Sequence, residues 1–436
     1  MIKAILRKIV IFLITIEARL VLKKYNPNII AITGNAGKTG AKDAIAAVLE
    51  PEFSVWKNEK SYNSDIGIPL TILHCKNGWL NPFSWLKNIY EGLALILFSH
   101  DYPKWLVLEV GADKPDDIGK FAKWLHPDIV VVTRIGETPV HVELFPSRDD
   151  LIEEKAKLVR ALRPGGILVL NADDPDVLAM RDLPKLAKVL TYGFSPVASF
   201  RVSNQNIIYI EKSHQSMPDG ITFKIDYLGN IIPVRLPGVV GRQNIYSALA
   251  AFAVGTALNI NFIGMIDSAA KYERPAGRLR LIDGISNSII LDDTYNSSPA
   301  ALELAIESVH DIKVSGRKIA VLGDMLELGH YTNDAHYKIG KQVPVHFDML
   351  VTVGQRARAF AKGAFDAGMK KNSIKSFSDS VEAGDYIKGI IGIGDLVLVK
   401  GSQGVRMERV VEKLMATPED KLKFLVRQEK EWIEKV

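Results

Sequence analysis

The sequence predicts an α/β fold: a doubly wound, mainly parallel sheet, followed by a second and smaller α/β domain. Three observations lead to this prediction. Compact apolar runs alternate with helical patterns over roughly the first 170 residues, which is the order that parallel sheets require. From about Val189 the runs become short and partly alternating, which indicates a small antiparallel extension. After an interruption at Arg274-Pro-Ala-Gly-Arg278, a fresh series of strands and helices begins.

Each element of this fold is predicted by a local pattern. In the first series, apolar runs predict strands at 29–32, 105–108, 128–133 and 166–170, and helical patterns predict helices at 41–49 and 151–162. The antiparallel extension is expected at 207–210, 221–227 and 231–236, before a helix of small apolar residues at 248–258. The strands of the second series are expected at 288–291, 318–322, 349–353 and 396–399.

A glycine-rich loop joins the first strand to the first helix. It has the spacing Gly-x-x-Gly-Lys-Thr and comprises Gly34, Asn35, Ala36, Gly37, Lys38 and Thr39. Glycines in such a loop let backbone N–H groups turn onto phosphate oxygens, the lysine supplies a mobile positive charge, and the threonine hydroxyl can ligate Mg²⁺. A tight turn whose glycines only relieve strain is the competing interpretation. The strand-to-helix context favours nucleotide binding.

Composition limits the class of protein. Of the 436 residues, 47% are hydrophobic and 24% are charged, which is typical of a globular protein. The net charge of +5 is too small to indicate nucleic-acid binding, and we see no dense basic tract with interleaved aromatic residues. The one cysteine, Cys75, excludes an internal disulfide and suits a reducing, cytoplasmic location.

Three apolar segments lie outside the α/β pattern. Residues 1–27 predict a basic amphipathic helix whose apolar run, 9–16, is too short to span a bilayer. This helix either lies peripherally on the inner face of a membrane or on a partner, or packs on the body of the protein. The segment 79–98 forms core or an exposed patch near this helix and has no catalytic interpretation. A packed or partner-binding helix is expected over 417–436.

Several polar residues occupy positions where a site could form. Glu109 ends a buried strand, where α/β enzymes place catalytic groups, although a carboxylate that caps a turn is the alternative. A turn-rich loop over 58–69 could line a site. Taken alone, His141 is more often a hydrogen-bonded turn residue than a ligand, and Lys155 an ordinary lysine on a charged helix.

In fixed order, these strings resemble one family, the Mur ligases, which are ATP-dependent amide-forming enzymes of peptidoglycan synthesis. The resemblance covers roughly 28–414, and within the family it is greatest to the MurF branch, which adds D-alanyl-D-alanine to a UDP-muramoyl tripeptide. Eight strings carry it: Thr33-Gly-Asn-Ala-Gly-Lys-Thr39 with Lys42, Asn63-Ser-Asp-Ile-Gly-Ile-Pro69, Glu109-Val-Gly-Ala112, His141-Val-Glu-Leu-Phe-Pro-Ser147, Gly241-Arg-Gln-Asn244, Asp292-Asp-Thr-Tyr-Asn296, Gly323-Asp-Met-Leu-Glu-Leu-Gly329 and Lys400-Gly-Ser402.

The resemblance implies domains, cofactors and residue roles. A central P-loop ATPase domain would cover 28–276 and a Rossmann-like C-terminal domain 277–416, with ATP and Mg²⁺ as cofactors. ATP would be bound by Gly34, Asn35, Ala36, Gly37, Lys38, Thr39, Asn244, Arg278, Asp293 and Asn296. Thr39 would hold one Mg²⁺ together with the β and γ phosphates, Glu109 and His141 would ligate a second Mg²⁺, and a carbamylated Lys155 would be a metal-bridging anion. Catalysis would depend on Lys38, Glu109, His141 and Lys155, and substrate contacts on Asn63, Ser64, Asp65, Lys400 and Ser402.

The expected reaction joins a carboxylate to an amine. Because this is uphill in water, ATP first phosphorylates the carboxylate, and the amine then attacks the acyl phosphate. The expected partners are a muramoyl-peptide-like acceptor and an amino acid or dipeptide donor, and the protein is expected to be a monomer. The same chemistry on another amino acid or acceptor, of the MurE, poly-glutamate or folyl-polyglutamate type, is an alternative. A non-enzymatic ATP-binding scaffold is another, but it would predict degraded phosphate and metal residues.

The chain also departs from the family pattern. The stretch before Asn28 is too short to fold as the usual N-terminal UDP-binding domain, so that domain is expected to be absent. Gln243 stands where a histidine is common, and Gln403 replaces an arginine expected after Lys-Gly-Ser. Asn296-Ser-Ser-Pro299 replaces the usual Asn-Ala-Asn-Pro. These last changes bear on substrate specificity more than on ATP chemistry.

Overall fold

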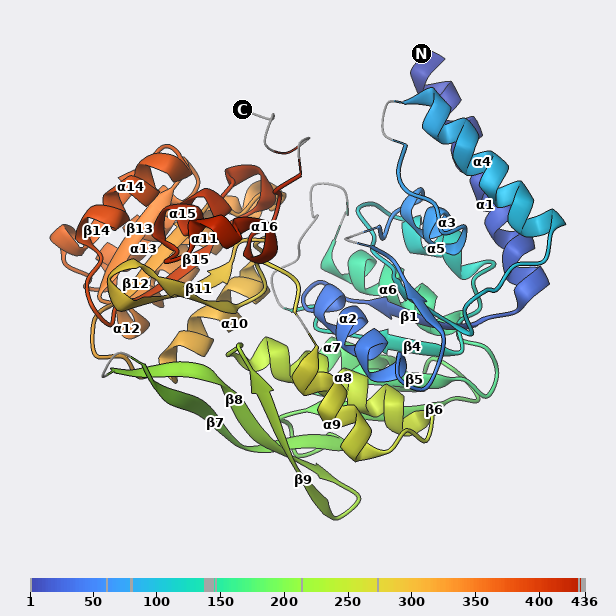
Figure 1. Cartoon of the computed structure of the whole chain (residues 1–436), viewed down its shortest axis with the longest axis horizontal. Helices are drawn as coiled ribbons and strands as arrows, with labels where there is room; N and C mark the ends of the chain where they lie inside the picture. Colours follow the sequence, from blue (N-terminus) through green and yellow to red (C-terminus); the bar gives the residue numbers. More distant parts are fainter. Residues whose placement is uncertain are drawn as a thin grey trace. The chain divides into compact units, whose positions relative to one another are not determined.

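The computed structural model describes residues 2–59, 62–78, 81–136, 145, 147–212, 215–272, 274–429 and 432, with the backbone alone for 2–5. Within this part, the chain divides into two compact units (Figure 1). The first takes in most of the chain up to Arg201 together with the later stretch Tyr246–Tyr272, and the second takes in Val202–Ile245 and the chain after Tyr272. No helix in the described ranges is both long enough and apolar enough to cross a membrane.

The first unit alternates strands and helices, as the sequence predicts. Its elements are α1 (Ile2–Tyr25), β1 (Asn28–Thr33), α2 (Lys38–Leu49), β2 (Val55–Lys57), α3 (Gly67–Ile72), α4 (Pro82–Leu97), β3 (Trp105–Glu109), α5 (Asp117–Ala122), β4 (Ile129–Val132), α6 (Arg148–Arg160), β5 (Ile167–Asn171), α7 (Pro175–Leu178), η1 (Ala179–Asp182), β6 (Lys188–Gly193), most of α8 (Arg242–Ala257), and α9 (Phe262–Lys271).

The sheet of this unit is parallel and has the order β2-β3-β1-β4-β5-β6. In its register Ile32 of β1 lies beside Glu109 of β3, and Thr33 lies beside Val132 of β4. The carboxyl ends of β1 and β3 therefore meet at one edge, next to the glycine-rich loop that follows β1. Ligands of open α/β sheets bind at such an edge.

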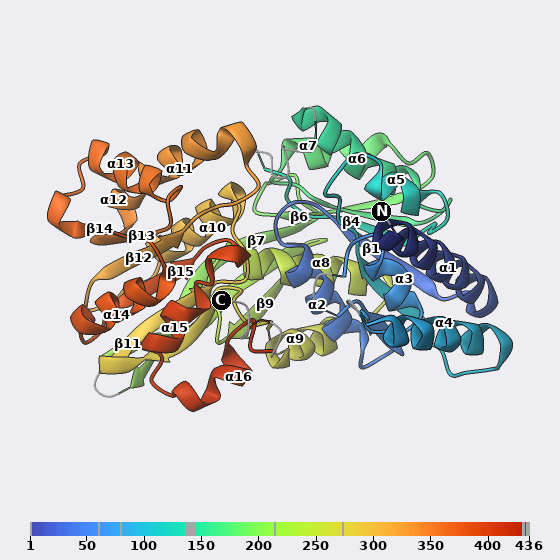
Figure 2. The same ribbon diagram turned by 90° about the horizontal axis from the view of Figure 1, so that it is seen from above.

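Helices cover both faces of this sheet, which explains why its strands are continuous apolar runs rather than alternating ones. Alternate β1 residues such as Ile29 and Ala31 belong to one buried cluster with side chains of α1, α5 and α6. Figure 2 shows α5 and α6 on one side of β1 and β4, and α2, α8 and α9 on the other. The doubly wound, mainly parallel sheet predicted from the sequence is confirmed.

The second unit begins with the antiparallel extension and continues as a smaller α/β sheet. Its elements are β7 (Phe200–Lys212), whose first two residues belong to the first unit, β8 (Gln215–Tyr227), β9 (Asn230–Pro237), β10 (Arg280–Gly284), η2 (Ile285–Asn287), β11 (Ser288–Asp293), α10 (Pro299–His310), β12 (Lys318–Gly323), η3 (Gly329–Tyr331), α11 (Thr332–Gly340), α12 (Val343–His346), β13 (Met349–Val353), α13 (Arg358–Asp366), η4 (Lys371–Ser373), β14 (Ile374–Phe377), α14 (Ser380–Ile390), β15 (Leu396–Lys400), η5 (Gln403–Val405), α15 (Glu408–Leu414), η6 (Pro418–Asp420) and α16 (Lys421–Phe424).

The α/β sheet of the second unit has the order β10-β11-β15-β12-β13-β14. All its neighbours are parallel except β10 and β11, which pair antiparallel. The four predicted strands are its central members β11, β12, β13 and β15. In this register Asp293, at the end of β11, lies beside Lys400, at the end of β15. The sequence does not predict the edge strands β10 and β14, because each is only partly buried and carries no continuous apolar run.

The helix predicted over 417–436 is wrong. The sequence predicts a single helix over 417–436, but the described part of this segment contains η6, the four-residue α16 and a helical residue at Trp432, which are not continuous. The chain leaves helical geometry at Leu425, which is extended, and Arg427 has a φ of 59°, in the left-handed region. The Arg427 guanidinium is buried against Glu408, with Nη1 2.9 Å from the carboxylate, so a buried ion pair rather than a helical face fixes this segment.

Candidate active site

The glycine-rich loop adopts a backbone that only glycine takes readily. Gly34 has a φ of 139° and Gly37 a φ of 85°. At Gly34 space is also short, since a Cβ atom there would lie 2.0 Å from Oγ1 of Thr133 on the loop after β4. The loop is held to the same segment by backbone bonds, in which the N–H groups of Asn35 and Ala36 both donate to the carbonyl of Arg134, at 2.8 and 3.0 Å.

The lysine of this loop lies over the loop itself. Lys38 begins α2, and its Nζ donates to the carbonyls of Gly34 at 3.0 Å and Asn35 at 3.4 Å. These bonds place a positive charge above the turn in which the glycines stand. An ammonium group on a long flexible stem can exchange such carbonyl contacts for phosphate oxygens.

Glu109 is the centre of a buried hydrogen-bond network. Its Oε2 accepts from Oγ1 of Thr39 at 2.8 Å, and its Oε1 accepts from Nδ2 of Asn63 at 3.2 Å. Glu109 is only 2% exposed. The side chain of Asn58 brackets its peptide groups, because Oδ1 accepts from the Glu109 N–H at 2.9 Å and Nδ2 donates to the Glu109 carbonyl at 3.2 Å. Three predicted residues therefore converge here.

Lys155 reaches the same loop from α6. The lysine is 2% exposed, and its Nζ donates to the Gly34 carbonyl at 3.2 Å, the group that Lys38 also contacts. Burial, together with the nearby positive charge of Lys38, lowers the pKa of Lys155 to about 7. A substantial fraction of this amine is therefore neutral at physiological pH, which an exposed lysine would not be.

The remaining predicted residues of the first unit are placed differently. Ser64 lies in the turn before α3, where its carbonyl accepts from the Ile68 N–H at 3.2 Å. Asp65 carries an ion pair to Arg7 of α1, with Nη2 3.5 Å from Oδ1. His141 lies outside the residues that the structure describes, so its predicted metal role stays a prediction.

A second group of predicted residues gathers at the carboxyl ends of β11 and β15. Nζ of Lys400 lies 2.7 Å from Oδ2 of Asp293, and both side chains are buried. The same Nζ donates to the Asn296 carbonyl at 2.9 Å. Ser402 joins the group, because its Oγ donates to the Ser297 carbonyl at 3.3 Å. Desolvation lowers the pKa of Lys400.

Two further predicted residues of this unit have other contacts. The Arg278 guanidinium lies over the ring of Tyr295, 4.0 Å from its centroid. Asn244 lies in the first turn of α8, and its Nδ2 donates to the Val240 carbonyl at 2.8 Å. Behind the strand ends, the buried Asp292 accepts from Oγ1 of Thr294 at 2.6 Å, and burial raises the Asp292 pKa to about 6.

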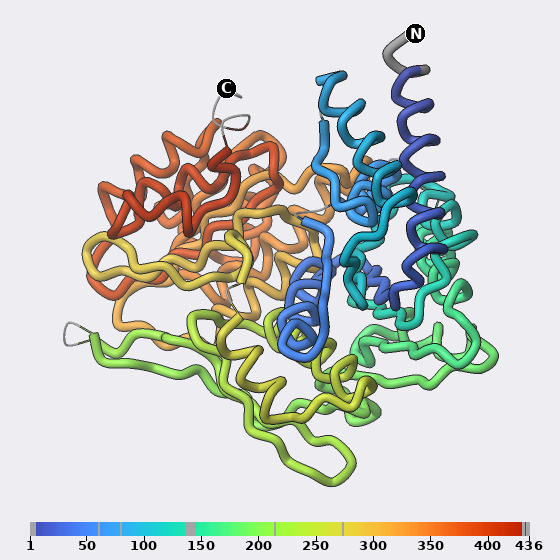
Figure 3. Tube along the Cα trace, turned by 45° about the vertical axis from the view of Figure 1, so that its right-hand side comes forward, coloured from blue at the N-terminus to red at the C-terminus, as the bar shows by residue number. Residues whose placement is uncertain are grey.

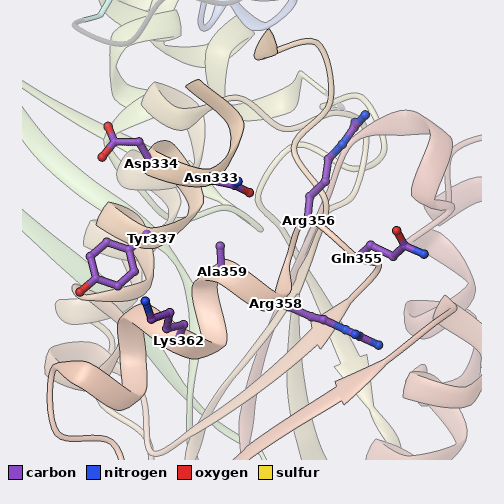
Figure 4. Close-up of a pocket in the computed structure, with 8 residues that line it drawn as sticks. All are labelled: Asn333, Asp334, Tyr337, Gln355, Arg356, Arg358, Ala359 and Lys362. Carbon is purple, nitrogen blue, oxygen red and sulfur yellow. The ribbon is translucent and has the colours of Figure 1, made fainter. Parts of the chain in front are cut away.

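The second unit also has an open hollow of about 530 Å³ between α11 and α13 (Figure 4). It is lined by Asn333, Asp334, Tyr337, Gln355, Arg356, Arg358, Ala359 and Lys362. None of the predicted site residues is in this lining. Lys362 already lies over the ring of Tyr337, 5.6 Å from the centroid, and the Tyr337 hydroxyl donates to Asp366 at 3.0 Å. The hollow therefore gives no sign of the predicted chemistry.

Two residues of the first site have a role that the sequence analysis did not identify. Asn58 fixes the backbone of Glu109, and Lys42, which is 2% exposed, donates from Nζ to the Asn58 carbonyl at 2.7 Å. Both act on the site through backbone atoms. The available signal was weak: Asn58 opens the turn-rich loop, and Lys42 follows the phosphate loop at the spacing of one helical turn.

The chemistry available at the first site is that of phosphate and a hard cation. The Thr39 hydroxyl and the Glu109 carboxylate offer oxygen ligands of the kind that Mg²⁺ prefers. Within the described ranges, no three His, Cys, Asp or Glu side chains form a preformed metal cluster. The oxygen pair thus fits a cation that completes its coordination with water and phosphate, as Mg²⁺ does at nucleotide sites.

Two family models of known proteins match the chain over the fold and the site described above. Residues 32–255 match the family model of the Mur ligase middle domain, and residues 277–403 match that of the Mur ligase glutamate ligase domain. The first model alone spans more than half of the chain. It includes the glycine-rich loop, Glu109 and Lys155, and the second model includes the ends of β11 and β15.

Individual proteins similar to this chain are ligases of the same family. The chain is 28% identical to the UDP-N-acetylmuramoyl-tripeptide–D-alanyl-D-alanine ligase of Bacillus subtilis over 92% of this chain and 79% of that protein, and 27% identical to the Escherichia coli enzyme of the same name over 88% and 76%. It also resembles the crystal structure of MurF ligase from Thermotoga maritima in complex with ADP, with a TM-score of 0.75, 25% identity, and coverage of 95% and 84%. A phosphate loop bonded to a buried strand-end glutamate, on this fold and with these matches, shows that the chain belongs to the Mur ligase family.

Proposed function

We propose that this protein is an ATP-dependent ligase of the MurF type, which joins D-alanyl-D-alanine to a muramoyl tripeptide through an acyl phosphate. Membership of the Mur ligase family and the names of its curated relatives support the reaction class and the substrates. The observation that carries the proposal is the 2.8 Å hydrogen bond between Thr39 and Glu109. It brings a hydroxyl of the phosphate loop and a buried carboxylate together as oxygen ligands that suit Mg²⁺, which a tight turn that only relieves strain has no need to do.

The reaction begins with phosphorylation of the acceptor. A carboxylate oxygen of the muramoyl peptide attacks the γ-phosphorus of ATP, the bond from that phosphorus to the bridging oxygen breaks, and ADP leaves. Two anions must approach one another in this step. Lys38 neutralises part of their charge once its Nζ leaves the Gly34 and Asn35 carbonyls for the phosphates.

Amide formation follows at the acyl carbon. The donor's amine nitrogen, after losing a proton, attacks this carbon, and the bond from carbon to the phosphate oxygen breaks. Inorganic phosphate leaves with both electrons of that bond. Because the acyl phosphate would otherwise be hydrolysed, the site must hold the donor before water reaches the intermediate.

Mg²⁺ is the expected cofactor at the first site. Thr39 and Glu109 would hold it, with His141 as a further ligand, and it would screen the phosphate oxygens and polarise the γ-phosphate. Glu109 is already oriented for this role, because Asn58 fixes its backbone and Asn63 donates to its Oε1. Asn63, Ser64 and Asp65 belong to the loop that would receive the muramoyl peptide.

Lys155 would contribute as a carbamate. Its neutral amine can add to CO₂ with loss of one proton, which converts a buried cation into an anion suited to a cation-binding site. The 3.2 Å bond from its Nζ to the Gly34 carbonyl places that group beside the phosphate loop. A buried lysine held as a permanent cation there would instead repel Lys38.

Residues of the second unit also carry expected ATP and substrate roles. We assign Asn244, Arg278, Asp293 and Asn296 to ATP, and Lys400 and Ser402 to the substrate. The position of Lys400 supports this assignment, because its ammonium contacts Asp293 and the Asn296 carbonyl at the carboxyl ends of β11 and β15, where α/β sheets bind ligands. We expect a monomer that acts in the cytoplasm, where ATP and nucleotide-linked precursors are made.

The proposal is tested by the dependence of phosphate release on substrates. With ATP, Mg²⁺, UDP-N-acetylmuramoyl tripeptide and D-alanyl-D-alanine, we expect release that falls to background when either peptide is omitted. Lys38→Ala should lower the rate at least about 10³-fold, because the γ-phosphate loses its counter-charge. Lys338→Ala, an exposed lysine of the second unit, is the control and should leave the rate unchanged.

The same assay separates this proposal from other family activities. If L-glutamate or diaminopimelate supports phosphate release while D-alanyl-D-alanine does not, the chain uses ligase chemistry on a different donor. If the complete mixture releases no phosphate at any donor, the ligase proposal is wrong. Mass spectrometry of the product would show whether the amide bond has formed.

A further inference from the structure

Two long helices of the first unit, α1 and α4, form a pair beside the parallel sheet. Figures 1 and 3 show them running side by side in the same direction. The inner face of α1 is part of the core, because Ile14, Ala18 and Val21 are fully buried there. The helix is thus fixed on the body of the unit along this face.

Contacts between the helices hold the pair together. Gly92 of α4 lies against the buried Glu17 of α1, and a Cβ atom at Gly92 would come within 2.3 Å of the Glu17 carboxylate. Further toward the carboxyl ends of both helices, Nζ of Lys24 and the hydroxyl of Tyr25 both donate to the Leu95 carbonyl at 2.9 Å. A positive charge at the carboxyl end of α4 also complements the helix dipole.

Each helix carries a second apolar stripe that faces solvent. On α1 this stripe comprises Leu6, Ile9, Leu13, Ile16 and Leu20, with the exposed Phe12 beside it. On α4 it comprises Phe83, Leu86, Tyr90, Leu93 and Leu97. Both follow the alternating three- and four-residue spacing of one helical face. Phe12 and Phe83 are 64% and 78% exposed, so large aromatic rings are left in water. An exposed apolar surface of this regularity indicates something that covers it.

The charges of the pair are almost all positive. The basic residues of α1 are Lys3, Arg7, Lys8, Arg19, Lys23 and Lys24, and its one acidic residue is Glu17. Glu17 is buried, and on α4 the basic Lys87 pairs with the acidic Glu91 at 3.5 Å. On a helical projection Lys23, Arg19 and Lys8 lie about 60°, 100° and 120° from the centre of the apolar stripe of α1, all on one side of it, and all three are exposed. An apolar stripe bordered by basic side chains is the pattern of helices that lie in a membrane interface.

We propose that the outer stripes of α1 and α4 dock this protein on an anionic lipid surface. The helices lie along the surface rather than enter it end-on, because their inner faces are fixed on the unit. The apolar stripes contact the acyl boundary, while Lys8, Arg19 and Lys23 contact lipid phosphates. A second copy of the chain fits less well, because it would bring two strongly basic helices together. The proposal does not depend on the ligase reaction.

Vesicle sedimentation with the full chain tests the proposal. We expect binding to vesicles of phosphatidylcholine and phosphatidylglycerol, several-fold weaker binding at high salt, and little binding to pure phosphatidylcholine. The double variant Phe12→Glu with Leu86→Glu should lower the partition coefficient at least tenfold. Lys8→Glu with Lys23→Glu changes only exposed charges, and it should weaken binding to the anionic vesicles alone.

The matched control is Leu186→Glu, which makes the same change at a leucine 74% exposed elsewhere in the first unit. It should bind vesicles as the unmodified chain does. Failure of the unmodified chain to bind anionic vesicles would overturn the proposal, as would equal loss in the control. A dimer in solution that the Phe12 and Leu86 variant converts to monomer, without vesicle binding, would assign the face to a second copy instead.

Discussion

Lys155 shows most clearly how a single residue differs from what its type implies. A lysine on a helix is usually solvated, but this one is 2% exposed and its ammonium lies beside a second cation, Lys38. A lone cation is costly to bury. The cost falls if the amine is neutral, and falls further if it carries a carbamate that binds a metal ion.

We predict that Lys155 forms a carbamate. With ¹³C-labelled bicarbonate, the protein should give a carbamate carbon signal in NMR spectra that Lys155→Ala abolishes, and the variant should lose ligase activity at least about 100-fold. Lys157→Ala, which removes a partly exposed lysine of the same helix, should keep the signal. Full activity at saturating bicarbonate with no carbamate signal in the unmodified protein would contradict this role.

At the scale of elements, the phosphate loop depends on Gly34 more than on the loop's other glycine. Gly34→Ala would place a methyl group 2.0 Å from Oγ1 of Thr133 and 3.1 Å from its carbonyl carbon, so the phosphate loop or the segment after β4 must move. We predict at least tenfold weaker binding of a non-hydrolysable ATP analogue, measured by isothermal titration calorimetry. Gly165→Ala is the control: its φ of 77° is also positive but nothing lies within 4 Å, so only about 1 kcal/mol of local strain is expected. Equal affinities for both variants would contradict the close-packing argument.

The contribution of the α1–α4 pair to the stability of the fold depends on pH. Burial raises the pKa of Glu17 to about 7, and its Oε2 has no hydrogen-bond partner among the described residues. The titratable groups in the same cluster are Cys75, Glu91 and Lys87. Of these, only Lys87 carries a positive charge. Folding therefore takes up a proton between the ordinary pKa of a glutamate and about 7, so stability falls as the pH rises through this window and is constant above it.

We predict that Glu17→Gln raises the free energy of unfolding at pH 8 by about 1 to 3 kcal/mol, and that the gain shrinks as the pH falls and disappears below the ordinary glutamate pKa. Urea unfolding followed by circular dichroism at several pH values measures this difference. Glu52→Gln, at an exposed glutamate, should show no such trend. A gain from Glu17→Gln that is the same at every pH would mean that the carboxylate is not buried as an acid.

At the scale of the whole molecule, the sequence predicts the fold well because its strands are buried on both faces. Such strands read as continuous apolar runs, and the runs at 29–32, 105–108 and 396–399 became β1, β3 and β15. The weakly buried edge strands β10 and β14 have no such signal, and the tail after 417 is shaped by the long-range pair of Arg427 and Glu408, which no local pattern reveals.

The site is predictable only in part, for a similar reason. Gly34, Lys38 and Thr39 lie within six residues of the sequence, so their spacing alone predicts a phosphate loop. Glu109 is 70 residues from Thr39, and only the parallel register of β1 with β3 brings the two together. Asn58 supports Glu109 by a hydrogen bond to its backbone N–H. Every residue type except proline has this group, so no sequence pattern reveals the contact.

The proposed reaction requires ATP to phosphorylate the acceptor carboxylate before the amide forms, and isotope transfer measures this directly. A muramoyl tripeptide labelled with ¹⁸O in both oxygens of its reacting carboxylate is turned over with ATP and D-alanyl-D-alanine, and the released phosphate is analysed by mass spectrometry. The acyl-phosphate mechanism predicts one ¹⁸O atom in each phosphate. The carboxylate oxygen that attacks phosphorus stays bonded to it when the amine displaces the phosphate. Unlabelled phosphate, released at the same rate as the peptide product, would contradict it.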